Sequence, residues 1–146
     1  MTVITDVPER RMWQALGRTL PRPRGIVTFS AHWETQGRTH VTAGPAPRTI
    51  HDFRGFPDAL YAMQYPAPGS EELVGLIERL LGPERVVRDE SWGFDHGAWG
   101  VVQPIYPDAD IPMVEMSLDR TLPPEEHIAL GVHLIVGVVD QAVMGH

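Results

Sequence analysis

Hydrophobic positions follow two periods along this chain, one typical of strands and one typical of helices. An apolar, β-branched run over residues 25–33 predicts a buried strand that places His32 at its tip. Further strands are predicted at residues 39–42, 86–87 and 111–118. The segments between these runs carry helix-like patterns, so strands and helices alternate.

Capping residues and apolar stripes predict four helical segments. The first begins after Asp6, an N-cap acceptor followed closely by a proline. Its apolar positions recur every four residues, at Met12, Leu16 and Leu20. The clearest helix lies within residues 70–82, between a serine cap and a terminal glycine. Helical patterns also cover residues 98–106, limited by Pro104, and a stretch that opens at 123–126.

This alternation predicts an α/β protein with three layers, α/β/α, around a mixed central sheet. The chain has 146 residues, of which 42% are hydrophobic and 21% are charged. That length and composition are typical of one globular domain with a single core region. We therefore expect residues 1–146 to form a single domain.

Charge and residue usage limit the partners of this domain. The net charge of −7 comes from 12 basic and 19 acidic residues, which argues against nucleic acid or an anionic membrane as the main partner. No signal peptide is recognisable, and the longest apolar stretch is too short to cross a bilayer, so we expect a cytoplasmic protein. Because there is no cysteine, any metal must be held by histidine and carboxylate.

Three histidines share surroundings that are typical of a functional site. His32 follows an apolar strand, whereas His51 and His96 lie in loops rich in aromatic residues, glycine and acid. Each histidine taken singly is more often a structural residue, and the spacing matches no compact metal motif. Asp52 and Asp95 are adjacent in sequence to His51 and His96, so either carboxylate could fix an imidazole tautomer. The sequence predicts that the three histidines converge on one crevice.

An ordered set of short motifs resembles a known enzyme family. The motifs are LPRP (20–23), SAHW (30–33), TIHDF (49–53), YPAPG (65–69), GFDHG (93–97) and YPDADIP (106–112). Together they resemble the DOPA-dioxygenase type of class III extradiol ring-cleavage dioxygenases. The resemblance implies an oxidoreductase of aromatic compound metabolism, with a mononuclear non-haem Fe(II) or Zn(II) that holds a catechol and dioxygen.

The resemblance also implies roles for the three histidines. His32 matches a metal-binding histidine of the family. His96 matches a catalytic histidine of the substrate pocket, which hydrogen-bonds the catechol or oxygen intermediates. His51 matches a motif at the border of the same site, which implies a substrate-binding role.

Other family motifs have no counterpart in this chain. The family's first metal ligand lies in a His-Gly-Ser/Ala-Pro motif ahead of the first helix, and a later Gly-Asn-x-Val-His-Asn segment carries an acid/base histidine. Neither motif, nor the C-terminal metal ligand, is found here. We therefore expect a domain truncated at both ends relative to the family, with weak metal binding, little activity and a tendency to form homo-oligomers.

Two alternatives to a dioxygenase stay open at this stage. One is a non-catalytic remnant or interaction protein that retains the fold. The other is a zinc hydrolase built on His32, His51 and His96.

Overall fold

The computed structural model describes residues 6–143, with side chains up to residue 134. Helices and strands alternate along these residues, as predicted. In chain order the elements are α1 (Pro8–Thr19), β1 (Ile26–Thr35), β2 (Thr39–Thr42), α2 (Asp58–Tyr61), α3 (Glu71–Leu81), the 3₁₀ turn η1 (Pro83–Arg85), β3 (Val86–Asp89), α4 (His96–Ile105), β4 (Met113–Asp119) and α5 (Pro124–Val143).

The four strands form one mixed sheet in the order β1-β4-β2-β3. β1 runs parallel to β4, and β2 runs parallel to β3, whereas β2 and β4 are antiparallel. β4 is the most deeply buried strand, while β1 lies at one edge of the sheet and is half exposed. The predicted mixed sheet is therefore confirmed.

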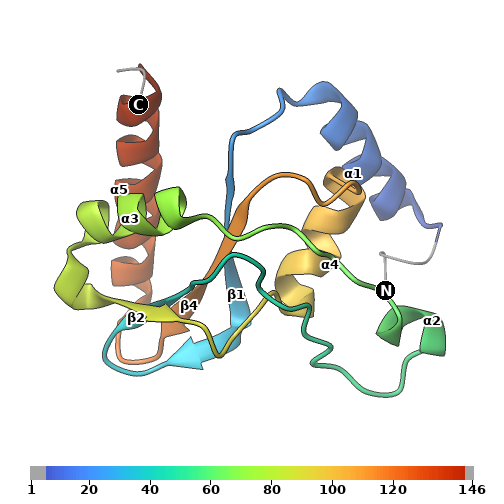
Figure 1. The fold of residues 1–146 in the computed structure, drawn as a ribbon, viewed down its shortest axis with the longest axis horizontal. Helices are drawn as coiled ribbons and strands as arrows, with labels where there is room; N and C mark the ends of the chain where they lie inside the picture. The colour runs from blue at the N-terminus through green and yellow to red at the C-terminus, as the bar shows by residue number, and fades with distance from the viewer. Residues whose placement is uncertain (1–5, 144–146) are drawn as a thin grey trace.

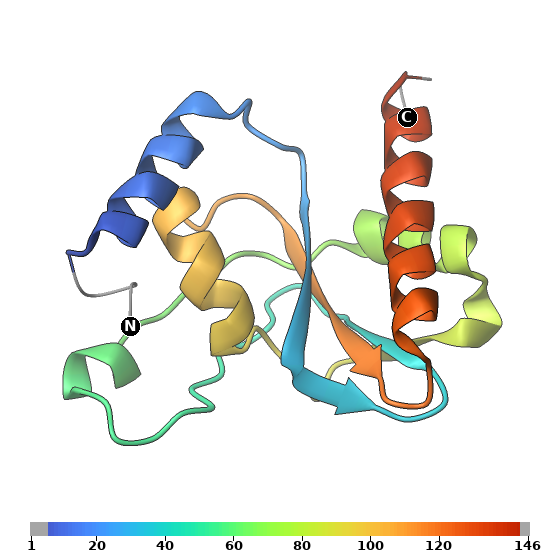
Figure 2. The same ribbon diagram turned by 180° about the vertical axis from the view of Figure 1, so that it is seen from behind.

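Helices flank the sheet on two sides, α1 and α4 on one and α3 and α5 on the other (Figures 1 and 2). Alternate side chains of β4 serve two separate hydrophobic cores. Met113 packs in the core that contains Trp99 of α4, and Val114 packs in the core that contains Val74 and Ile77 of α3. The predicted three-layer α/β arrangement is confirmed in this form.

Local sequence explains where the two best-defined helices begin. The Ser70 hydroxyl accepts a hydrogen bond from the backbone N–H of Leu73 at 3.0 Å, which is the capping geometry predicted for α3. Gly82 follows α3 with a positive φ of 95°, a conformation that favours glycine. Asp95 caps α4, which starts two residues earlier than predicted and continues through Pro104 without a break.

The first helix differs from its predicted form in its cap. Val7, not Asp6, is the N-cap, and it makes no side-chain capping bond. Asp6 instead accepts a charge-assisted hydrogen bond from the Arg11 guanidinium at 2.9 Å. Helix α2 was not predicted, since four residues are too few to show helical periodicity.

The apolar stripe of α1 is largely exposed. Met12, Leu16 and Leu20 are 60%, 42% and 44% accessible, and α1 contacts α4 through Gly17 instead. An exposed stripe of this kind favours association, so the homo-oligomer stays a prediction with this surface in its support. In the part of the chain that the structure describes, no helix is both long and apolar enough to traverse a bilayer. The cytoplasmic location also stays a prediction.

The strand that carries His32 is the main departure from the predicted fold. β1 is an edge strand instead of a buried one, and it continues past His32 to Thr35. Its pairing with β4 shifts register between Phe29 and Glu34, and the strand bends there (Figure 2). His32 thus lies in a bulge within β1, not at a strand tip. Bulges re-aim side chains and are common beside functional sites.

Replacing Gly17 tests the contact between α1 and α4. A Cβ at this position would lie 1.9 Å from the carbonyl oxygen of Ile105, so the G17A variant must push the two helices apart. We expect a loss of about 1–3 kcal/mol in the free energy of unfolding, measured by urea denaturation. The control is G131A in α5, where a Cβ meets nothing within 4 Å and alanine should stabilise the helix. Equal stability of the two variants would contradict the close contact.

Candidate functional site

Three side chains from distant segments converge beside the bulge of β1. His32 comes from the bulge, Asp52 from the loop between β2 and α2, and His96 from the first residue of α4. One nitrogen or oxygen of each side chain lies within 4.8 Å of the others. The rings of His32 and His96 are 4.2 Å apart between centroids. Of the three histidines that the sequence predicts to converge, the structure brings His32 and His96 together in this cluster.

Asp52 lies between the two imidazoles and contacts both of them. Its Oδ1 is 2.8 Å from Nδ1 of His96, and its Oδ2 is 3.3 Å from Nδ1 of His32. Oδ1 also accepts the backbone N–H of His96 at 3.0 Å. Burial alone would raise the pKa of Asp52, but the hydrogen bonds from the backbone and ring of His96 lower the pKa below its ordinary value. Asp52 is therefore an ionised acceptor.

A single backbone bridge brings the two loops of the site together. Thr49 pairs with Phe94 in an isolated β-bridge, with hydrogen bonds of 2.7 and 2.8 Å on either side. This bridge places Asp52, three residues beyond Thr49, against the start of α4. The loop that contains Asp52 is thereby anchored to the loop that contains His96.

The bulge of β1 is fixed against the N-terminus of α4. The Ser30 hydroxyl donates a buried hydrogen bond of 2.6 Å to Oδ1 of Asp95. Gly97 allows the close approach, because a Cβ there would lie 2.6 Å from Ser30 Oγ and 2.8 Å from Cδ2 of His32. The absence of a side chain at Gly97 is what lets His32 lie beside His96.

A buried carboxyl group of β4 binds the loop that precedes α4. Glu115 is fully buried, and its Oε1 and Oε2 accept hydrogen bonds of 3.0 Å from the Asp95 N–H and from Nε1 of Trp92. Burial, together with the nearby carboxyl group of Asp95, raises the pKa of Glu115 to about 9. Glu115 therefore carries its proton at neutral pH. The Trp92 ring stacks on Trp33 at 5.4 Å, which joins this loop to the bulge a second time.

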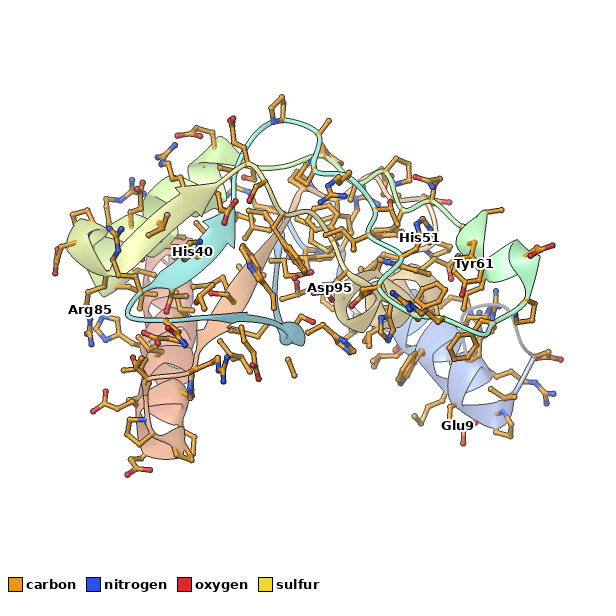
Figure 3. All side chains as sticks on the ribbon, turned by 90° about the horizontal axis from the view of Figure 1, so that it is seen from below. Glu9, His40, His51, Tyr61, Arg85 and Asp95 are labelled. Carbon is orange, nitrogen blue, oxygen red and sulfur yellow. The ribbon has the colours of Figure 1, made fainter. Side chains whose placement is uncertain are left out.

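His51 lies in a different environment from the other two histidines. Its Nε2 is 2.7 Å from the carbonyl oxygen of Met63, and its ring packs edge-on against Phe53 at 5.9 Å. Phe53 in turn packs edge-on against His96 at 5.3 Å. Figure 3 shows His51 on the α2 side of Asp95, with His40 on the other side of Asp95 over β2. His51 thus borders the cluster across an aromatic ring and is not one of its three members.

The donor set suits a transition-metal cation. Two imidazoles and one carboxylate make up the ligand types of mononuclear non-haem iron sites, and they also bind zinc. The side chains of His32, Asp52 and His96 are 43%, 19% and 21% exposed, so a cation could reach them from solvent. Among the described residues this is the one grouping of three or more such side chains with donor atoms this close. The residues present therefore fit a metal such as Fe(II).

Asp52 is the member of the cluster to which the sequence assigned no site role. Its adjacency to His51 was noted, but the structure pairs Asp52 with His32 and His96 instead. Likewise Asp95 caps α4 and binds Ser30, and makes no bond to its neighbour His96. Sequence neighbours in an extended loop point to opposite sides, so adjacency could not identify these pairs.

Comparison with known proteins defines the class of this domain. Residues 10–139 match the family described as the catalytic LigB subunit of aromatic ring-opening dioxygenase. The chain therefore belongs to the LigB family of class III extradiol dioxygenases, as the sequence motifs suggested.

Similar proteins include several that are named as DOPA dioxygenases. The chain is 52% identical over 145 residues to a 4,5-DOPA dioxygenase extradiol of Escherichia coli (strain K12), which covers 99% of this chain and 53% of that protein. It is 43% identical to the Beta vulgaris 4,5-DOPA dioxygenase extradiol over 84% of this chain and 46% of that protein. The chain spans about half the length of these relatives.

A solved structure agrees with the fold. A crystal structure of an uncharacterized protein from Escherichia coli K12 superposes with a TM-score of 0.72 at 46% identity. The match covers 90% of this chain and 48% of that one. The fold described above is therefore that of one half of a longer family member.

A methyl group at Gly97 should disturb the cluster directly. In G97A the new Cβ must displace the His32 ring or Ser30, because both lie under 3.0 Å away. We expect Zn(II) affinity, measured by isothermal titration calorimetry, to fall about 10- to 100-fold. The matched control is G100A in the same helix, where a Cβ meets nothing within 4 Å. Unchanged affinity in folded G97A would contradict the prediction that the space left at Gly97 sets the position of the His32 ring.

The protonated state of Glu115 makes stability depend on pH. In the unfolded chain this carboxyl ionises near its ordinary pKa of 4.5, whereas in the folded chain it keeps its proton to about pH 9. Between these values the unfolded state binds fewer protons, so stability falls as pH rises, by up to about 1.4 kcal/mol per pH unit from this group. Urea denaturation from pH 5 to pH 9 should show a shallower decline in E115Q. An identical slope in both proteins would contradict the assignment.

Proposed function

We propose that this domain serves extradiol ring cleavage of a catecholic aromatic compound, with a mononuclear Fe(II) or Zn(II) bound at the cluster that contains His32. The observation that supports this proposal best is the meeting of His32 and His96 at a carboxylate, within a chain of the LigB family. When bound, Fe(II) supplies the redox chemistry that allows triplet dioxygen to react with a singlet ring.

His32 is proposed as a metal ligand. Its side chain is the most exposed of the three in the cluster. The bulge of β1 and the close approach of Gly97 hold its ring in place. A ligand whose direction is fixed by the backbone loses little conformational entropy when it binds an ion. Asp52 and His96 are the further side chains close enough to act on the same ion or on its substrate.

His96 is proposed as the catalytic histidine. Its Nδ1 is engaged by Asp52, which leaves Nε2 to hydrogen-bond a catechol hydroxyl group. Phe53 stands edge-on to the His96 ring and offers an apolar surface for the aromatic ring of a substrate. We propose a substrate-side role for His51 through this same aromatic surface, since Nε2 of His51 already meets the Met63 carbonyl group.

The two alternatives have less support. A zinc hydrolase built on three histidines needs His51 as a ligand, but this ring lies outside the cluster of His32, Asp52 and His96. A non-catalytic remnant would retain the fold without a use for the paired imidazoles. Because the chain spans about half of its relatives, we propose that the isolated chain turns over slowly.

Oxygen uptake tests the proposed function. A sample reconstituted anaerobically with Fe(II) and then given DOPA and air should consume oxygen slowly and form a coloured ring-opened product. H32A should abolish both signals, and H96A should lower the rate about 10- to 10²-fold, because a hydrogen bond to the substrate is lost. H133A, which removes an exposed histidine of α5, is the control and should leave the rate unchanged.

Other outcomes would contradict this proposal. Oxygen uptake that survives H32A would remove His32 from the metal site. Zinc-dependent ester hydrolysis without oxygen uptake would favour the hydrolase. Neither activity, with Fe(II) bound, would favour the remnant.

A further inference from the structure

Asp52 contacts both histidines of the site, and in each ring the contacted atom is Nδ1. Each contact joins a carboxylate oxygen to Nδ1, at 2.8 Å for His96 and 3.3 Å for His32. Among the described residues, neither ring makes a hydrogen bond through Nε2, so both of these nitrogens are left unengaged. This arrangement is more specific than a loose grouping of three metal-binding side chains.

An ionised carboxylate has only acceptor sites, so its imidazole partners must supply the protons. Oδ1 of Asp52 already receives two donors from His96, its backbone N–H at 3.0 Å and its ring at 2.8 Å. Oδ2 lies 3.3 Å from Nδ1 of His32, which is a close contact between the two groups but lies just beyond the usual length of an N–H···O hydrogen bond. Each carboxylate oxygen thus lies nearest to Nδ1 of one histidine, with a formed hydrogen bond to His96 and a longer contact to His32.

We propose that Asp52 is a positioning residue that holds His32 and His96 in the Nδ1–H tautomer, so that both Nε2 atoms face the metal and substrate side. A neutral imidazole that donates from Nδ1 carries its lone pair on Nε2, and only an unprotonated nitrogen binds a metal or accepts a proton. One carboxylate therefore orients two imidazoles, one as a metal ligand and one as a hydrogen-bond acceptor for the substrate.

The proposal gives Asp52 a different role from the third metal ligand that its donor type would also fit. If Asp52 and the two Nδ1 atoms coordinated one ion, that ion would replace the protons that now lie between them. The inference rests on the proposed function only for the role of the Nε2 atoms toward metal and substrate. The tautomers themselves exist without metal or substrate. It can therefore fail or succeed independently of ring cleavage.

Nitrogen NMR of the histidine side chains tests the tautomers in the metal-free protein. At pH 8, above the ordinary titration range of imidazole, ¹⁵N–¹H correlation spectra distinguish protonated from unprotonated ring nitrogens. We expect His32 and His96 to carry the proton on Nδ1, with their signals assigned through the H32N and H96N variants. A proton on Nε2 of both rings in the wild-type chain would overturn the proposal, and this measurement depends on no variant that alters Asp52.

The D52N variant gives the matched comparison. An asparagine amide accepts through one oxygen and donates through its nitrogen, so at least one of the two rings should move its proton to Nε2. The control is D89N, because Asp89 makes the same contact with Nδ1 of His40 at 2.8 Å outside the cluster. D89N should change His40 and leave His32 and His96 as they are. Unchanged tautomers of both rings in folded D52N would overturn the positioning role.

Zn(II) provides a second measurement that separates a positioning residue from a ligand. If Asp52 positions the rings, the Nδ1 protons of His32 and His96 should persist when Zn(II) is added, and D52N should bind Zn(II) about 10- to 100-fold more weakly. Loss of the Nδ1 protons on Zn(II) binding would place the ion between Asp52 and the rings, and the proposal would be wrong. Neither result depends on whether the chain cleaves a catechol.

Discussion

The buried hydrogen bond from Ser30 to Asp95 holds the two halves of the site together. It joins the bulge of β1 to the residue that caps α4, over a length of only 2.6 Å. Asp95 in turn is held by Glu115 of the central strand β4. The protonated carboxyl group of Glu115 accepts a hydrogen bond from the backbone N–H of Asp95. The separation of His32 and His96 is therefore set by a polar network beneath them, and not by contacts between the two rings alone.

This network leaves only one of the two acidic residues Glu115 and Asp52 ionised. Glu115 stays neutral because its surroundings are apolar and because a second carboxyl group lies beside it. Asp52, which is nearer to solvent, is the ionised member. Two acidic residues at different depths thus have different tasks, since one supports a loop and the other faces the imidazoles.

The sequence predicts elements with strong local signals and misses those set by long-range pairing. Ser70 and residues 39–42 were placed correctly, because a cap and a short β-branched run act within a few residues. His32 and His96 were identified from motifs that lie far apart in the chain. The bulge of β1 could not be foreseen, because its register depends on β4, more than eighty residues later. The partners of Asp52 were missed for the same reason, since the bridge from Thr49 to Phe94 creates them.

The position of β1 at the edge of the sheet gives the site a weak point of its own. In the described sheet this strand pairs with β4 alone, and its pairing is interrupted at the bulge. Edge strands with few buried side chains open more readily than central ones, without unfolding of the rest of the domain. A brief detachment of β1 would carry His32 away while Asp52 and His96 stay joined. The lifetime of a bound ion would then depend on how often this one strand frays, as well as on the strength of the metal–nitrogen bond.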